Sequence, residues 1–233
     1  MSTQRATART PHQLPSGRHG LPRTYVSNNQ RERILDAVVQ VVGSKGYAAF
    51  TIEDVISTAG VSRRTFYDHF SNKEQAFLAA YDLIVGHLMG SVRASFGRGT
   101  DWVDRIRRGL STFLESLAQE PLAAHVCIVE ILAGGPLALQ RRADAMSGFE
   151  GFFALEHQVH RPTQPLAAET VIGGLYEVVY SRVLAGQAAE LPQLLPELLH
   201  SLMLPFVGSD LADVEYHAAH ERSRPVEYGV QDT

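Results

Sequence analysis

Residues 61–77, VSRRTFYDHFSNKEQAF, decide the fold of this chain of 233 residues. Phe66 and Phe70 stand four positions apart, so on a helix they share one face and can pack inward. Another face of the same helix carries cationic and aromatic side chains: Arg63, Arg64 and Tyr67. The stretch is therefore predicted to be a core element that also displays groups suited to a polyanion. The alternative, from composition alone, is an amphipathic helix with a merely solvated cationic face.

Two further helices are predicted before this one. The first, over residues 27–45, has an apolar stripe spaced i, i+4, i+7 and i+8: Ile34, Val38, Val41 and Val42. Ser27 or Asn28 can cap its start, and Gly46 suits a left-handed end.

The second helix is short and covers residues 52–59. Thr51 and Asp54 have the spacing of a capping box at its start, and Gly60 ends it. Ser62 then caps the helix that carries the two arginines.

A long fourth helix is predicted over residues 72–96, where Ser71 and Glu74 repeat the capping-box spacing. Ahead of it, two short helices are joined by a tight turn that contains glycine, and the second of them is cationic. This is the pattern of a helix-turn-helix. The phenylalanines of the second short helix then belong to the core, and its arginines face a DNA major groove.

Residues 51–82, TIEDVISTAGVSRRTFYDHFSNKEQAFLAAYD, resemble the DNA-binding domain of TetR/AcrR-type bacterial regulators. The resemblance covers residues 28–82. It rests on the Thr before the second helix, the Gly-Val-Ser turn, the Thr-Phe-Tyr-x-His-Phe core and the Asn-Lys-Glu beyond it. The rest of the chain is similar to the family only in helical character and length.

The resemblance implies DNA contacts at particular positions. Arg63 and Arg64 stand where the family reads base edges or neighbouring phosphates, and a guanidinium fork suits guanine O6 and N7. Lys73 stands at a recurrent phosphate contact, whereas His69 matches a mainly structural position between core and backbone. The expected DNA-binding residues of the helical domain are Thr51, Ser62, Arg63, Arg64, Thr65, Tyr67, His69 and Lys73.

An N-terminal arm, residues 1–25, carries four arginines and no acidic residue, whereas residues 81–233 hold 11 basic and 19 acidic residues. The arm has no periodic apolar face, so we expect it to be disordered without DNA. Arg18 and Arg23 lie nearest the first helix and are expected to reach phosphates or a narrow minor groove. The alternative is an inert leader.

Beyond residue 100 the apolar spacing predicts further helices, one of them over residues 121–132, and no strand-like alternation. The fold class is therefore all-α. The expected domains are a disordered basic arm (1–25), a three-helix helix-turn-helix DNA-binding domain (26–80), a larger helical effector-binding and dimerisation domain (81–208) and a polar C-terminal tail (209–233).

The last two long helices, within residues 165–206, are apolar over more of their surface than a monomer needs. In TetR/AcrR-type regulators the corresponding pair forms a four-helix bundle with a second copy. The resemblance therefore implies a homodimer, which places two recognition helices one DNA turn apart. A charge at Leu198 or Leu202 is expected to break it. The alternative is a helix pair buried within one chain.

The resemblance also implies an effector pocket that the fifth to eighth helices enclose. Each aromatic candidate for its wall, taken alone, is more typical of plain core than of ligand contact. The expected lining is Trp102, Phe113, Glu130, Phe149, Phe153, His157, Tyr176 and Tyr180, with Phe152, His125 and Glu177 as further candidates.

Other chemistry has little support in the sequence. Without G-x-S-x-G, a phosphate loop or H-E-x-x-H, we expect neither an enzyme nor a cofactor. His157 with His160 and His217 with His220 have metal-binding spacing but no third fixed ligand, so no metal is expected. Cys127, the one cysteine, is expected to be a small buried hydrophobe rather than a redox sensor. Because no apolar run approaches the roughly 20 residues that span a bilayer, we expect a cytoplasmic protein without a membrane partner.

The sequence thus predicts a dimeric, sequence-specific DNA-binding transcriptional regulator, which in this family is most often a repressor. A small apolar ligand is expected to release it from a palindromic operator. Its partners are then double-stranded operator DNA, a second copy of itself and an unidentified small-molecule effector. The alternative is an effector-independent DNA-binding protein that acts constitutively or in DNA organisation.

Overall fold

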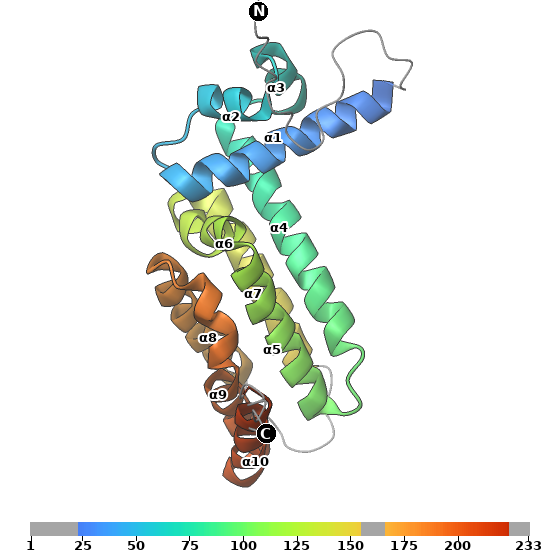
Figure 1. The fold of residues 1–233 in the computed structure, drawn as a ribbon, viewed down its shortest axis with the longest axis vertical. Helices are drawn as coiled ribbons and strands as arrows, with labels where there is room; N and C mark the ends of the chain where they lie inside the picture. Colours follow the sequence, from blue (N-terminus) through green and yellow to red (C-terminus); the bar gives the residue numbers. More distant parts are fainter. Residues whose placement is uncertain (1–22, 155–165, 224–233) are drawn as a thin grey trace, which may run out of the picture.

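The computed structural model describes residues 23–154 and 166–223, and within these ranges every regular element is helical (Figure 1). The all-α prediction is confirmed. Figure 1 shows α4 leaving the small N-terminal helices and running along the larger helical domain. The N-terminal elements are α1 (Arg23–Lys45), α2 (Ile52–Ala59), α3 (Arg63–His69) and α4 (Lys73–Phe96).

The start of α1 differs from the prediction. The helix begins at Arg23, and Ser27 and Asn28 are exposed residues inside it rather than caps. Short polar side chains are tolerated inside a helix where they point to solvent. The predicted end of the arm at residue 25 therefore falls within α1, and residues 1–22 lie outside the described part of the chain.

The larger domain consists of α-helices with three irregular helical segments between them. In chain order the elements are α5 (Trp102–Gln119), α6 (Pro121–Ala124), the π-helical η1 (His125–Val129), the 3-10 segment η2 (Glu130–Ala133), α7 (Pro136–Ala154), α8 (Ala167–Leu184), the 3-10 segment η3 (Ala188–Leu194), α9 (Leu195–Val207) and α10 (Ser209–Ser223). Residues 121–132, predicted as one helix, thus form an α-helical, then a π-helical and then a 3-10 segment. Such turns often occur at functional sites.

A helix occupies the C-terminal region where a polar tail was predicted. Ala212 and Ala219 of α10 are buried, and α10 packs along α9. His200 Nε2 of α9 lies 2.9 Å from Asp213 Oδ1 of α10. Because alanines bury little apolar area, this contact leaves a weaker pattern in the sequence than a leucine stripe does.

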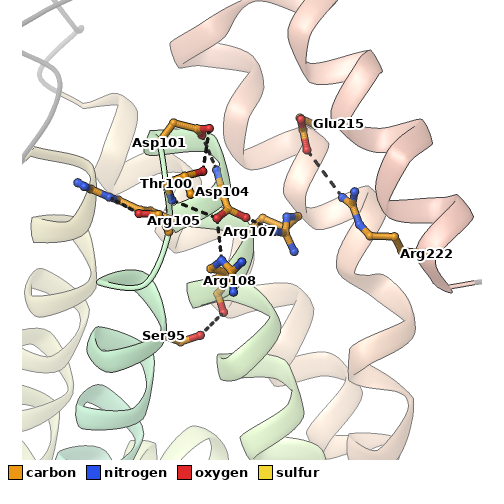
Figure 2. A network of polar contacts seen from close by, with 10 residues as sticks. Ser95, Thr100, Asp101, Asp104, Arg105, Arg107, Arg108, Glu215 and Arg222 are labelled. Carbon is orange, nitrogen blue, oxygen red and sulfur yellow. Dashed lines mark hydrogen bonds and ion pairs between the residues drawn. The ribbon is translucent and has the colours of Figure 1, made fainter.

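A polar network holds the turn between α4 and α5 (Figure 2). Asp101 caps α5 by accepting the Asp104 N–H at 2.9 Å, and Asp104 in turn accepts from Arg107 and, at 2.7 Å, from Arg108 Nε. The hydrogen bond from Arg108 is the main reason that the pKa of Asp104 is lowered. Ser95 of α4 donates to the Arg108 carbonyl at 3.3 Å. The end of α4 that is remote from α3 is thereby tied to α5.

In the described ranges, no single helix combines the length and the apolar character needed to cross a bilayer. The segments Trp102–Gln119 and Pro121–Ala133 meet that requirement only when joined, and they are bent by 107° at their junction.

Candidate functional sites

A capping box begins α2, as predicted. The Thr51 hydroxyl accepts from the Asp54 N–H at 3.2 Å, and the Asp54 carboxylate accepts from the Thr51 N–H at 3.1 Å. Lys45, at the end of α1, donates to the other carboxylate oxygen at 2.6 Å. That bond is the largest reason that the pKa of Asp54 is lowered. The end of α1 is thus tied to the start of α2, and Thr51 lies exposed at the surface.

A glycine makes the turn between α2 and α3. Gly60 has a φ of +61°, in the left-handed region where a side chain is strained. Arg33 of α1 donates to the carbonyl groups of Ala59 and Gly60, the latter at 3.0 Å. Because a side chain of α1 satisfies the carbonyls of the turn, the turn that leads into α3 is fixed relative to α1.

One side of α3 is core and another is surface. Ser62 caps the helix by accepting from the Thr65 N–H at 3.0 Å. Phe66 is fully buried, and Tyr67 packs edge-on against it with ring centroids 5.5 Å apart. Tyr67 itself is 47% exposed. The helix therefore combines a core residue with an exposed aromatic ring, as its spacing predicts.

The two arginines of α3 have different surroundings. Arg63 forms an ion pair with Glu53 of α2, and its guanidinium lies 5.9 Å from the centroid of the Tyr67 ring. The hydrogen bond with Tyr67 and the charge of Glu53 raise the pKa of Arg63. Arg64 is exposed. Any DNA contact of Arg63 therefore competes with Glu53.

Lys73 and His69 lie against aromatic side chains of the domain. Lys73 Nζ donates to the Phe50 carbonyl at 3.1 Å and lies 4.6 Å and 5.5 Å from the ring centroids of Phe50 and Tyr47. A phosphate contact requires this ammonium to turn outward. The His69 ring is half-buried, 6.3 Å from that of Phe70, which agrees with a mainly structural role.

At the C-terminal end of this domain the cap of α4 differs from the prediction, and at its N-terminal end two residues predicted to contact DNA are not fully described. Asn72, rather than Ser71 with Glu74, caps α4 by accepting a backbone N–H at 2.8 Å. Asn and Ser are comparably good caps, so spacing alone does not separate them. Arg18 lies outside the described residues, and Arg23 is described only as the first residue of α1, so their DNA contacts stay predictions.

A largely apolar cavity of about 90 Å³ lies within the larger domain. Its walls come chiefly from α4, α5, α7 and α8, with contributions from η1 and α9. Along α4 the lining extends from Tyr81 to Phe96, a rise of about 22 Å at 1.5 Å per residue. The residues expected at the pocket that do line the cavity are Phe113, Phe149, Phe152 and Tyr176.

Other residues expected at the pocket lie elsewhere. The Trp102 ring packs 5.8 Å from that of Phe206, and Tyr180 stacks on Tyr176 at 6.3 Å. Neither Trp102 nor Tyr180 is among the described residues that line the cavity. The side chains of two further candidates are outside the description: Phe153 and His157.

One end of the cavity is polar. Tyr176 donates to the Ile128 carbonyl of η1 at 2.6 Å, and Arg142 of α7 lies over the Tyr176 ring with Cζ 4.0 Å from its centroid. Tyr81 and Cys127 also line the cavity. Burial raises the pKa of both tyrosines, and it raises that of the Cys127 thiol to about 12. All three groups therefore keep their protons at neutral pH.

Glu130 joins the larger domain to the DNA-binding helices and is not among the described residues that line the cavity. Its carboxylate accepts from the Tyr47 N–H at 2.6 Å, and its other oxygen lies 3.1 Å from His125 Nε2. Tyr47 packs edge-on against Phe77 of α4, with centroids 4.7 Å apart. The segment η1–η2 thus meets the cavity through Ile128 and the DNA-binding domain through Glu130.

Sequence reasoning missed Arg142 and Tyr81 as cavity residues. Arg142 follows Arg141, which lies on the outside of α7 and pairs with Asp82 at 2.7 Å. A usable signal was present, because Arg142 precedes Phe149 by seven positions and so shares its helix face. The two neighbouring arginines differ in their surroundings, since Arg141 lies at the surface and Arg142 lines the cavity.

No three His, Cys, Asp or Glu side chains in the described ranges are placed to hold a metal ion. His217 and His220 lie on α10, where the His220 ring stacks on Tyr216 with centroids 6.1 Å apart. The pair His157 and His160 falls outside these ranges.

Comparison with known proteins supports this arrangement. Residues 34–80 match the model of the family "Bacterial regulatory proteins, tetR family". The uncharacterised HTH-type transcriptional regulator YerO from Bacillus subtilis is 35% identical over 66 residues, which are 28% of this chain and 23% of that relative. The HTH-type transcriptional activator FasR from Mycolicibacterium smegmatis is 29% identical over 93 residues, 40% of this chain and 42% of the relative. These matches span less than half the length of either relative.

A solved structure extends the likeness to the overall fold. The transcriptional regulator FadR from Bacillus subtilis, described in complex with stearoyl-CoA, has a TM-score of 0.67 and 21% identity to this chain, with 73% of this chain and 96% of that chain covered. At this identity the likeness shows the fold alone. Residues 34–80 thus carry a DNA-binding domain of the tetR type, and the described chain has the fold of the TetR-like FadR structure.

Proposed function

We propose that the protein is a dimeric, sequence-specific repressor, which a small apolar ligand releases from a palindromic DNA operator. The observation that carries the proposal is that α4 contacts both the DNA-binding domain and the cavity. Phe77 of α4 is buried against Tyr47 and Phe50 of the DNA-binding domain. From Tyr81 to Phe96 the same helix lines the cavity. A ligand that changes the placement of α4 therefore changes the position of α3.

The release is a shift between two arrangements of the helices. In one arrangement the spacing between the two recognition helices does not suit the DNA. A ligand that binds this arrangement more tightly moves the population toward it, by no more than the difference between its affinities for the two arrangements. The cavity of about 90 Å³ is smaller than the roughly 150 Å³ cavity known to hold benzene. A larger ligand must therefore displace the cavity walls, which include α4.

The walls of the cavity favour a ligand that is mostly hydrocarbon. FadR of Bacillus subtilis, which shares the fold, is described with stearoyl-CoA, a molecule with a long hydrocarbon chain. FasR is described as an activator, so the sign of the regulation has to be measured for this chain.

The second copy is proposed to dock on exposed apolar side chains of α8 and α9. Val178, Leu184 and Leu204 are 39%, 54% and 42% exposed. Leu202, where the sequence suggested a charge to break the dimer, is 4% exposed and lines the cavity. A charge at Leu202 would therefore disrupt the core of one chain, and the informative variants are Val178→Asp and Leu204→Asp.

Selection of binding sites from random double-stranded DNA tests the proposal. A dimeric regulator is expected to select a palindrome whose half-sites lie roughly 34 Å apart, one helical turn. In sedimentation the double variant Val178→Asp/Leu204→Asp is expected to be a monomer that no longer selects the palindrome. Failure to recover any consensus would refute sequence-specific binding. If no ligand stabilises the protein or weakens its complex with the selected DNA, the effector-independent alternative is favoured.

A further inference from the structure

Arg142 is the only charged residue among the described residues that line the cavity. We propose that the cavity takes a small apolar monocarboxylic acid whose carboxylate pairs with Arg142. The inference rests on the proposed effector function, because it names the chemical class of that effector. It goes beyond an apolar ligand by assigning a charge to one end of the molecule and a position to that charge.

The guanidinium of Arg142 is partly withdrawn from water, and the other described residues that line the cavity carry no charge. Its Nε is buried and has no hydrogen-bond partner in the described part of the chain. Its Cζ lies 4.0 Å from the centroid of the Tyr176 ring. The described lining includes neither aspartate nor glutamate. A partly buried cation is more favourable with an anion beside it than without one, so an anion that enters the cavity completes the arrangement.

Two phenol groups line the cavity together with this guanidinium. Tyr81 and Tyr176 stay protonated, because burial raises the pKa of each, and their hydroxyl groups can therefore donate to an anion. Tyr176 donates to the Ile128 carbonyl at 2.6 Å. A carboxylate that recruits this hydroxyl releases the carbonyl of η1. The next segment, η2, begins with Glu130, which holds the Tyr47 N–H, so the polar end of the ligand acts close to the link with the DNA-binding helices.

The remainder of the cavity is hydrocarbon and aromatic. Phe96 and Phe152 have ring centroids 5.0 Å apart, and Phe113 and Phe149 have theirs 5.3 Å apart. These rings surround the part of the ligand that follows the carboxylate. Because the cavity volume is only about 90 Å³, a medium-length alkyl acid or an aryl acid fits with less displacement of the helices than a stearoyl chain.

A free acid and an acyl thioester differ at the group that would face Arg142. The free acid carries a carboxylate there, which forms charge-assisted hydrogen bonds with a guanidinium. The thioester carbonyl is neutral and pairs more weakly. Arg142 is therefore expected to give the free acid a higher affinity than its coenzyme A ester.

Isothermal titration calorimetry of the DNA-free protein with octanoate, 1-octanol and octanoyl-CoA tests the proposal. Octanoate is expected to bind the wild type at least about tenfold more tightly than 1-octanol, because hydrogen bonds between ionised groups are roughly twice as strong as neutral ones. Arg142→Gln should lose this preference and keep its affinity for 1-octanol, which also shows that the variant is folded. Arg141→Gln is the matched control, since its guanidinium pairs with Asp82 on the surface, and it should retain the preference.

Equal affinity of the wild type for octanoate and 1-octanol overturns the proposal without any variant. So does an Arg142→Gln protein that still prefers octanoate, and so does tighter binding of octanoyl-CoA than of octanoate. Release of the selected operator DNA is measured separately. Octanoate that binds with the expected preference but does not weaken the operator complex supports the acid site and contradicts the effector function. A neutral compound that binds and releases DNA supports the effector function and overturns the acid.

Discussion

The DNA-binding helices and the larger domain use similar residues in opposite ways. In the N-terminal domain Phe50, Phe66 and Phe77 fill a closed core, and the side chains proposed to contact DNA lie outside it. In the larger domain Phe113 and Phe149 are only half-buried, because they border a cavity. Function at the surface leaves polar residues at unusual positions in the sequence. Function in the interior depends on aromatic residues, which the sequence alone does not distinguish from ordinary core residues.

The largest expected effect comes from breaking the outer surface of α3. Arg64→Ala and Tyr67→Ala should each abolish selection of the operator while leaving the melting temperature nearly unchanged, because both side chains are exposed. Loss of one good base contact costs about 1–3 kcal/mol per half-site, and twofold symmetry doubles it to about 2–6 kcal/mol. Fluorescence anisotropy with the selected DNA measures the change.

Arg93→Ala, an exposed arginine of α4 far along the helix from α3, is the matched control and should bind DNA like the wild type. Normal operator binding by both α3 variants would show that this helix does not enter the groove.

The next effect contrasts the two interiors. Phe66→Ala should lower the free energy of unfolding by about 3–5 kcal/mol, since Phe66 is fully buried in a closed core. Phe149→Ala should cost less than about 3 kcal/mol, because that ring already borders a void and makes fewer contacts to lose. Urea unfolding followed by circular dichroism compares them. A larger loss at Phe149 than at Phe66 would mean that the cavity is not loosely packed.

The sequence predicts the DNA-binding helices better than the pocket for a physical reason. Caps and turns depend on local chemistry, so Thr51, Ser62 and Gly60 were placed correctly from their neighbours alone. The inward direction of a side chain in a long apolar helix depends on which other helices pack on it. Spacing therefore could not separate Phe113, which lines the cavity, from Trp102, which packs on α9.

The π turn of η1 and the position of Glu130 were beyond sequence reasoning for the same reason. Glu130 was expected at the pocket as a polar anchor, because it lies within a mostly apolar stretch of the sequence. Its partner proved to be the Tyr47 N–H, 83 positions away, in the other domain. The apolar surroundings of Glu130 follow from the sequence, but the group that its carboxylate binds follows only from the tertiary packing.

Glu130 also allows the boundary between the two regions to be tested. Glu130→Ala should leave the Tyr47 N–H without its acceptor, which costs about 1–3 kcal/mol for a buried donor. Hydrogen exchange at Tyr47 and in the following turn should then be faster by roughly 5- to 150-fold. Glu130→Gln keeps one acceptor oxygen and should show a smaller acceleration. Unchanged exchange in the alanine variant would mean that this hydrogen bond does not hold the two regions together.

The smallest expected effect compares two helical glycines, one in each setting. A Cβ added to Gly109 of α5 would meet Val92 and Phe96 side-chain atoms at 3.6–3.8 Å, which is ordinary contact beside the cavity. Gly109→Ala should therefore stabilise the protein by about 0.5–1 kcal/mol, because alanine reduces the backbone entropy of the unfolded chain. It should also weaken octanoate binding, because it narrows the cavity.

A Cβ at Gly43 of α1 would meet Leu122 Cβ at 3.0 Å and its backbone at 3.1–3.2 Å. Since that backbone cannot withdraw cheaply, Gly43→Ala should destabilise the protein instead. Thermal unfolding of both variants gives the sign of the change in melting temperature at each position. The same sign at both positions would contradict the contrast between a tightly packed junction of the domains and a loosely packed cavity.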